Sequence, residues 1–186
     1  MKELSLNILD ISENSVKAKA TLVEITLTET EDRLTITITD DGVGMTEQTR
    51  LSVIDPFYTT RKTRKVGLGI PLFKFAAEQT GGGIEIISRH VDSHPEDHGT
   101  TVSATFFKNH IDFTPLGDVT STFTTLIQGH PDTDFVYRHT LEGKSVDFDT
   151  REVRAVLEEV PLDSYEVLLW IKSNLEEQYV GFYKQK

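Results

Sequence analysis

The sequence lacks cysteine and has no long apolar run. The absence of cysteine excludes disulfide bonds and cysteine-based metal sites. No stretch approaches the roughly 20 apolar residues that a membrane-spanning helix needs. Glu3 and Asp10 interrupt the N-terminal segment where a signal peptide would require continuous apolar residues. From these absences we expect a soluble, cytoplasmic protein without a membrane partner.

Positive charge is also scarce, with 19 Lys and Arg against 30 Asp and Glu and a net charge of -11. This balance argues against general nucleic-acid binding, which normally requires a basic face. The hydrophobic content of 37%, including 10 Phe, is sufficient for a folded core. A chain of 186 residues has room for one large domain or for a domain with an appendage.

The scarce cations are concentrated in one segment, TTRKTRK, which holds Arg61, Lys62, Arg64 and Lys65. Most charge runs are solvated loops. This run, however, leads into VGLGIPL, where Gly67 and Gly69 precede a predicted helix, LFKFAAEQ. A glycine turn that opens a helix exposes backbone N–H groups and the positive end of the helix dipole. The combination favours a phosphate-binding loop.

The N-terminal segment has the spacing of an amphipathic helix, with Leu4, Ile8 and Ile11 on one side. A polar stripe on the same helix consists of Glu3, Asn7, Asp10 and Asn14. Such a stripe is normally the solvated face. Alternatively, Asp10 and Asn14, one turn apart, place a carboxylate and an amide oxygen near one point, which suits a water-activating base beside Mg²⁺.

Two alternating, β-branched segments, Thr21 to Glu29 and Arg33 to Thr39, predict neighbouring strands. The second is followed by DDGVGM, which on its own indicates a turn. Its two glycines have no side chains, so a ligand could also lie against the backbone there. A turn followed by a strand is predicted within Gly81 to Arg89, and another strand at Gly99 to Phe107. This order of helices and strand pairs favours an α+β fold with helices on one face of the sheet.

Five segments occur in the order of the motifs of the GHKL superfamily: ILDISENSVKAKATLVEI, DDGVGM, DPFYTTRKTRKVGLGIPL, GGGIEIISR and GTTVSATF. The superfamily includes gyrase, the heat-shock chaperone ATPase, MutL-type repair proteins and histidine kinases. The resemblance spans about residues 2 to 107. It implies the Bergerat ATP-binding fold, a two-layer α/β sandwich with a mixed sheet. The PFYTTRK segment resembles the sensor-kinase branch, and the first motif resembles the MutL branch.

The resemblance implies which residues contact the adenine base of the nucleotide. Asp40 matches the aspartate that accepts a hydrogen bond from the adenine amino group. Gly42 and Gly44 would let the base lie against the backbone, and Met45 would contact its face. Thr100 matches a threonine that supports adenine recognition.

The resemblance likewise implies the roles at the phosphates. Asn14 resembles the Asn that holds Mg²⁺, and Asp10 lies where ATP-hydrolysing members carry a Glu base. The remaining positions belong to the second glycine motif and to the loop before it: Arg61, Lys62, Gly67, Leu68 and Gly69. ATP and Mg²⁺ are thus the expected cofactors.

Departures from the superfamily pattern concern Asp41 and the histidines. Asp41 stands where Asn is common, a change that we do not expect to abolish binding. None of the six histidines has the helical His-Glu or His-Asp context of a phosphoacceptor, and the ATP motifs start almost at Met1, so self-phosphorylation is a poor fit. The histidines are His90, His94, His98, His110, His130 and His139.

Residues 108–186 follow the ATPase motifs, and we expect them to form a small accessory α+β module after a domain at residues 1–107. The sequence predicts a helix with Val119 and Phe123 on one side, a hairpin around Glu142, and two further helices. Excess acid in this part suggests a protein partner. Two functions compete: an ATPase or protein kinase acting in trans on a partner, and a nucleotide-gated binding module with negligible turnover.

Overall fold

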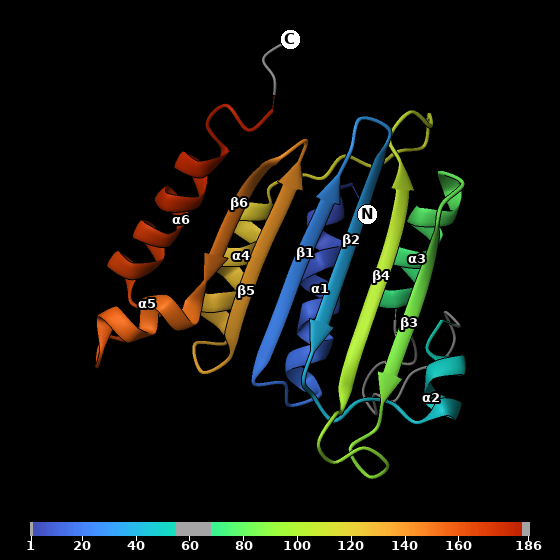
Figure 1. Ribbon diagram of the computed structural model, residues 1–186, viewed down its shortest axis with the longest axis horizontal. Helices are drawn as coiled ribbons and strands as arrows, with labels where there is room; N and C mark the ends of the chain where they lie inside the picture. The colour runs from blue at the N-terminus through green and yellow to red at the C-terminus, as the bar shows by residue number, and fades with distance from the viewer. Residues whose placement is uncertain (1, 55–67, 184–186) are drawn as a thin grey trace.

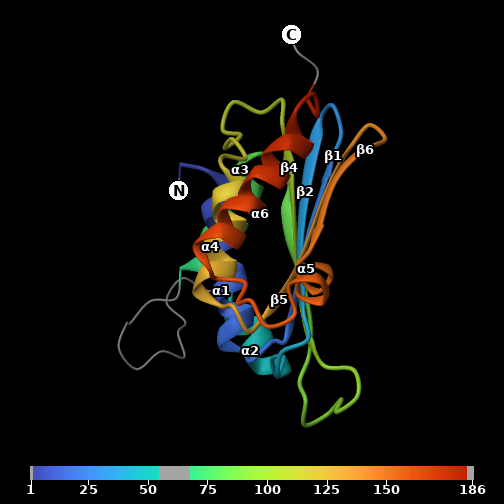
Figure 2. The ribbon, with the colours of Figure 1, turned by 90° about the vertical axis from the view of Figure 1, so that its left-hand side faces the viewer.

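The chain forms two layers, a mixed sheet and a set of helices on one of its faces (Figures 1 and 2). The structure is a computed structural model that describes residues 2–54 and 68–183. The strands are β1 (Leu22–Glu29), β2 (Arg33–Asp40), β3 (Gly83–Arg89), β4 (Gly99–Phe107), β5 (Asp134–Leu141) and β6 (Lys144–Asp149). The helices are α1 (Leu4–Lys17), α2 (Glu47–Ser52), α3 (Gly69–Gln79), α4 (Val119–Gly129), α5 (Thr150–Leu157) and α6 (Tyr165–Tyr179).

The six strands lie in the order β3-β4-β2-β1-β5-β6, and all neighbouring pairs are antiparallel except β1 with β5. Helices α1, α3, α4 and α6 cover the same face (Figure 2). The α+β class, the mixed sheet and the placement of helices on one face are therefore confirmed.

The two faces of the sheet follow from the alternation in its strands. Apolar residues such as Ile25, Ile36 and Ile38 point into the buried layer beneath the helices. The opposite face carries hydroxyl side chains that pair across β2 and β4, with Oγ1 of Thr37 2.9 Å from Oγ of Ser103. Cross-strand pairs of this kind fix the register of a sheet. The register in turn places Asp40 opposite Thr100.

Helix α1 buries Leu4, Ile8 and Ile11 against the sheet, as the spacing predicts. Its polar stripe, however, is not uniformly solvated. Asn7 is only 1% exposed, whereas Asp10, one turn later, is exposed. Helix α1 packs beside both α3 and α4.

The C-terminal segment joins the sheet of the ATPase motifs. Strand β5 pairs with β1 in parallel, with Ile25 opposite Tyr137, and β6 then forms the sheet edge. The predicted hairpin is confirmed, since Glu142 and Gly143 both have positive φ, at 48° and 83°. The division of the chain at residues 107 and 108 stays a prediction, and it runs through one continuous sheet.

Three further predictions concern helices. The predicted helix that carries Val119 and Phe123 is α4, where Phe123 packs against the rings of Phe135 and Phe148. The two further predicted helices are α5 and α6, and Asp149 caps α5 by accepting a hydrogen bond from the N–H of Arg151. The short helix α2 was not predicted, because six residues are too few for a recognisable apolar period. None of the helices in residues 2–54 and 68–183 is long and apolar enough to cross a membrane.

Candidate functional site

The carboxylate of Asp40 lies at the end of β2, between α1 and β4, and the residue is 9% exposed. Its Oδ2 accepts a hydrogen bond from Oγ of Ser15 at 2.6 Å. Its Oδ1 accepts from the backbone N–H groups of Gly42 at 3.0 Å and Thr100 at 3.2 Å. A carboxylate has about four acceptor positions. The protein therefore holds Asp40 with three hydrogen bonds, and one acceptor position remains.

Burial raises the pKa of the Asp40 carboxyl, and the nearby Asp41 carboxylate raises it further. The hydrogen bonds from Ser15, Gly42 and Thr100 oppose this rise but do not cancel it. Burying a carboxylate next to a second acid is unfavourable for folding. Such a cost at the end of a strand is typical of a binding position rather than of a purely structural one.

The loop after Asp40 comes into close contact with other backbone segments. A Cβ on Gly42 would lie 2.8 Å from the carbonyl oxygen of Ala18, and one on Gly44 would lie 2.0 Å from that of Arg89. Gly44 also has a φ of +68°. Both glycines are therefore required by chain packing alone. Their contact with a nucleotide base stays a prediction.

Ser88 on β3 connects this loop to the start of β4, and the sequence did not single it out. Its Oγ accepts from the N–H of Met45 at 2.7 Å and lies 2.8 Å from Oγ1 of Thr100 and 3.1 Å from the carbonyl of Gly99. Thr100 thus contacts Asp40 through its backbone N–H and Ser88 through its hydroxyl.

Two other residues of the site were also missed. Ser15, which contacts Asp40, follows Asn14 directly in the sequence. His98 lies in the loop before β4, and its Nδ1 is 2.6 Å from the carbonyl of Gly42. Serine in a helix and histidine in a loop are common, so no local signal marks either one. Their roles depend on contacts between distant segments.

Asp41 points away from this cluster toward the start of β1. Its carboxylate accepts from the N–H groups of Thr21 at 2.7 Å and Leu22 at 2.9 Å. Burial by itself raises the pKa of Asp41, but the hydrogen bonds from Thr21 and Leu22 outweigh it, and the net shift is downward. Asp41 therefore connects the end of β2 to the start of β1 by hydrogen bonds. Its role differs from that of Asp40.

The structure brings Asp10 and Asn14 together with the start of α3. A Cβ on Gly69 would lie 3.5 Å from Nδ2 of Asn14 and 3.5 Å from Cβ of Asp10. Helix α3 begins at Gly69, and its N-cap residue, Leu68, makes no side-chain cap hydrogen bond. The first N–H groups of a helix without a side-chain cap can bind an anion. Pro71 lies in the first turn and has no N–H group, so it leaves no unsatisfied donor there. One carboxylate, one amide and a helix N-terminus thus share one location.

Three predicted positions, Arg61, Lys62 and Gly67, lie outside the described residues. Among residues 2–54 and 68–183 there is no group of three or more His, Asp or Glu side chains arranged to hold a metal ion. A magnesium ion at Asn14 would therefore depend on phosphate and water oxygens for its other ligands.

Comparisons with known proteins identify the fold and the family of the chain. Two solved structures have the same fold at low identity. The N-terminal domain of a DNA repair protein gives a TM-score of 0.56 at 16% identity, over 79% of this chain and 52% of that one. The MutL ATPase domain of Aquifex aeolicus, complexed with ADP, gives 0.54 at 15% identity, over 85% of this chain and 70% of that one.

Sequence relatives are sensor proteins and kinases. The heme sensor protein HssS of Staphylococcus saprophyticus is 33% identical over 98 residues, which are 51% of this chain and 20% of that protein. Sporulation kinase A of Bacillus subtilis is 33% identical over 108 residues, 58% of this chain and 16% of the kinase. The chain thus spans a fifth or less of these relatives. The profile of the histidine kinase-, DNA gyrase B- and HSP90-like ATPases matches residues 2–110, more than half of the chain. The chain belongs to this family of ATPases.

Proposed function

We propose that the chain binds ATP with Mg²⁺ and transfers the terminal phosphoryl group to water or to a partner protein in trans. ATP binding follows from the family, and the remainder is our proposal. The observation that supports this proposal is that one helix, α1, contributes residues to both ends of the proposed site. Ser15 of this helix holds Asp40, and Asp10 and Asn14 of the same helix lie at the start of α3.

At the adenine end, the one remaining acceptor position of Asp40 suits the adenine amino group. The three hydrogen bonds from Ser15, Gly42 and Thr100 fix the carboxylate in place before the base arrives. Gly44 and Met45 continue the same loop, which would form the surface beneath the base. This set of residues fits an adenine ring.

At the phosphate end, Asn14 would supply an amide oxygen to Mg²⁺, and the N–H groups at Gly69 would meet phosphate oxygens. Magnesium, when bound, neutralises charge on the phosphates. The exposed carboxylate of Asp10 would accept the proton of the attacking water or hydroxyl. We assign Gly67 and Leu68 to the same phosphate loop, and Arg61 and Lys62 to contacts with phosphate oxygens.

Calorimetry with ATP, ADP and GTP tests the adenine assignment. We expect both adenine nucleotides to bind more tightly than GTP, and Asp40→Asn to weaken ATP binding by more than about 1 kcal/mol. Asp41→Asn is the matched control, because it removes the same charge from the next residue, which faces Thr21 instead. Equal affinity for GTP, or equal losses in the two variants, would contradict the assignment.

The second candidate is a nucleotide-gated binding module with negligible turnover. The position of Asp10 beside the start of α3 favours chemistry over this alternative. A wild-type protein that binds ATP and shows neither hydrolysis nor phosphotransfer, with or without its partner, would support the binding module instead.

A further inference from the structure

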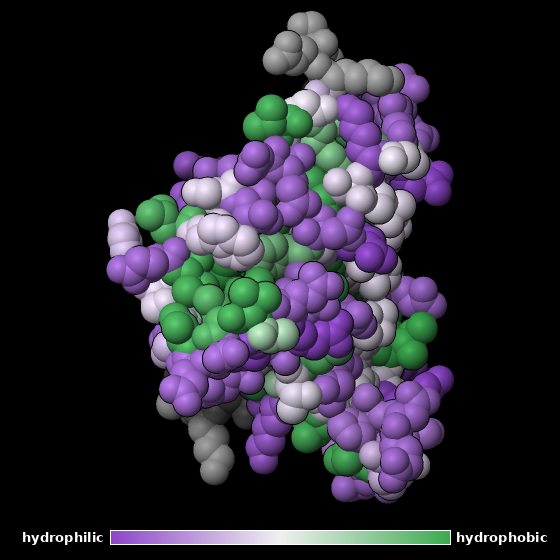
Figure 3. All heavy atoms as spheres, turned by 60° about the vertical axis from the view of Figure 1, so that its left-hand side comes forward, coloured by the Kyte–Doolittle hydropathy of each residue, from purple (hydrophilic) through white to green (hydrophobic). Residues whose placement is uncertain are grey.

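A groove of about 680 Å³ opens at the far edge of the sheet, between β6, α5 and α6. Strands β1 and β5 separate β6 from β2, so the groove is remote from Asp40. Figure 3, turned so that this edge comes forward, shows hydrophobic side chains gathered in a hollow among hydrophilic ones. The nucleotide proposal leaves this surface without a role.

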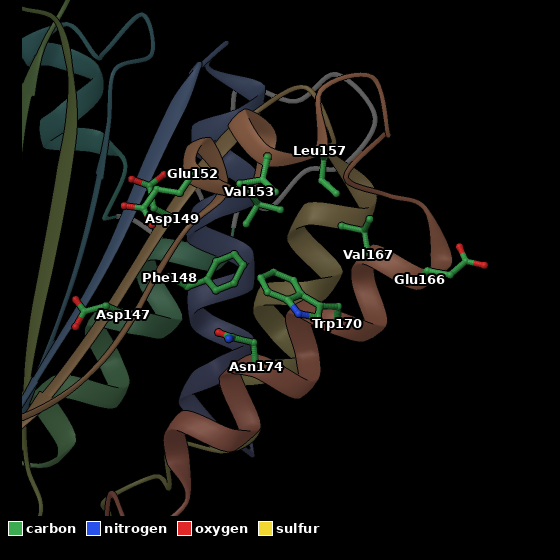
Figure 4. A pocket seen from close by; sticks show the side chains of 11 residues that line it. Asp147, Phe148, Asp149, Glu152, Val153, Leu157, Glu166, Val167, Trp170 and Asn174 are labelled. Carbon is green, nitrogen blue, oxygen red and sulfur yellow. The ribbon is translucent and has the colours of Figure 1, made fainter.

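The floor of the groove is apolar. The rings of Phe148 and Trp170 face each other with centroids 6.3 Å apart (Figure 4). Val156 is 82% exposed and Trp170 is 54% exposed. Five of the 13 exposed large hydrophobic residues of the described chain fall between Val156 and Trp170, inclusive, and these two residues line the groove. A concentration of exposed apolar side chains, rimmed by polar ones, marks an interaction site.

The rim of the groove is acidic on both sides. Asp147, Asp149 and Glu152 stand on one side and Glu166 on the other (Figure 4). Asp147 and Asp149 form ion pairs with arginines. Glu152 and Glu166 have no ion pair with any residue in the described part of the chain. The groove lining contains no lysine or arginine, so the charges of Glu152 and Glu166 stay uncompensated within the groove.

The edge strand itself is partly blocked. The side-chain amide of Gln178 on α6 accepts from the N–H of Asp147 at 3.0 Å and donates to its carbonyl at 3.1 Å. An added β-strand would have to displace this pair. A helix that binds in the groove is therefore favoured over a strand that pairs with the edge of the sheet.

We propose that this groove binds an amphipathic helix of a partner protein whose apolar stripe has Lys or Arg on both sides. The apolar stripe would cover Trp170, Val156 and Phe148, and the flanking cations would meet Glu152 and Glu166. The charge complementarity also discriminates among occupants. A second copy of this chain, with its net charge of -11, would bring acid against acid. An anionic membrane surface would be repelled for the same reason.

The test uses the single tryptophan of the chain, Trp170, as a reporter. A synthetic helical peptide of about five turns, with a leucine stripe flanked by lysines on both sides, is titrated into the full chain. We expect a blue shift of Trp170 emission and saturable binding. A second peptide keeps the leucine stripe but carries glutamate in place of lysine, and we expect it to bind at least about tenfold more weakly.

Variants separate the groove from general charge effects. Glu152→Lys with Glu166→Lys should weaken binding of the lysine peptide about tenfold. Glu85→Lys with Glu177→Lys is the control, because it changes the net charge equally at exposed positions outside the groove. Val156→Asp tests the apolar floor at a position too exposed to affect folding, and it should also weaken binding.

Three results would overturn the proposal. One is equal binding of the lysine and glutamate peptides, and another is an equal loss in the two double variants. The third is concentration-dependent self-association of the free chain that shifts Trp170 emission, which would assign the groove to a second copy. None of these measurements involves nucleotide, so failure here is distinct from failure of the ATP proposal.

Discussion

The hydroxyl of Ser15 lies 2.6 Å from the carboxylate of Asp40 and connects α1 to the end of β2. The partners are 25 residues apart in the sequence. Because Ser15 follows Asn14 on α1, the same helix that fixes the adenine-side carboxylate also carries the phosphate-side residues. A shift of α1 would therefore move both ends of the proposed site together.

Neutralising Asp40 should preserve or increase the stability of the free protein while weakening ATP binding. Burial raises the pKa of this group above its unfolded value, so the folded state binds the proton more readily. The charged form therefore disfavours folding above the folded pKa, and this penalty disappears as the pH falls below the unfolded pKa. Urea unfolding of Asp40→Asn at neutral pH and near pH 4 measures the effect. The advantage of the variant should shrink at the lower pH.

Asp41→Asn should behave in the opposite way. Burial tends to raise the pKa of Asp41, but hydrogen bonds from Thr21 and Leu22 lower it below the unfolded value. Its charge therefore stabilises the fold above the unfolded pKa, and the contribution is lost as the pH falls through the folded pKa. We expect Asp41→Asn to lower the urea midpoint at neutral pH. Shifts of the same sign in Asp40→Asn and Asp41→Asn would show that their environments do not differ as described.

Asp10→Asn should retain ATP binding and lower turnover by roughly 10² to 10⁴, the range for losing general-base assistance. Asn14→Ala should instead lose the Mg²⁺-dependent part of binding, because its amide oxygen is the proposed ligand. Steady-state hydrolysis and binding, each with and without Mg²⁺, distinguish the two. Glu13→Gln is a control on the same helix, since Glu13 faces His130. Turnover unchanged in Asp10→Asn would remove its assigned role.

Gly44→Ala should destabilise the protein by about 1–3 kcal/mol. The new Cβ would lie 2.0 Å from the carbonyl oxygen of Arg89, and φ is +68°. Gly83→Ala is the matched control, because a Cβ there meets nothing within 4 Å. Denaturant unfolding compares them. Similar stabilities of the two variants would contradict the close packing of the loop.

Glu29→Gln should loosen the C-terminal segment and destabilise the fold by about 1–3 kcal/mol. Glu29 Oε2 lies 3.0 Å from Nε2 of His139, which is 0% exposed, and 3.2 Å from the hydroxyl of Tyr183. Its Oε1 pairs with Lys108 at 2.7 Å. Hydrogen exchange near residues 179–183 reports the loosening. Glu24→Gln, on the exposed face of the same strand, should leave both exchange and stability unchanged.

The sequence by itself determined those features that depend on neighbouring residues. The apolar spacing at Leu4, Ile8 and Ile11 defined α1, and alternation defined β1 and β2. The order of the motifs indicated the ATPase family, which the comparison confirms. These signals are readable because periodic burial of one face leaves a periodic pattern in the chain.

Only the tertiary structure decided which distant groups meet. The parallel pairing of β5 with β1, the contact of Ser15 with Asp40, and the bridge from Met45 through Ser88 to Thr100 all join separate segments. The groove at Trp170 likewise exists only because α5 and α6 lie beside β6. A local pattern reports which face of an element is buried, but the packing of elements determines what that face contacts. Serine and histidine contribute no periodic signal, so their roles emerge from register and helix packing alone.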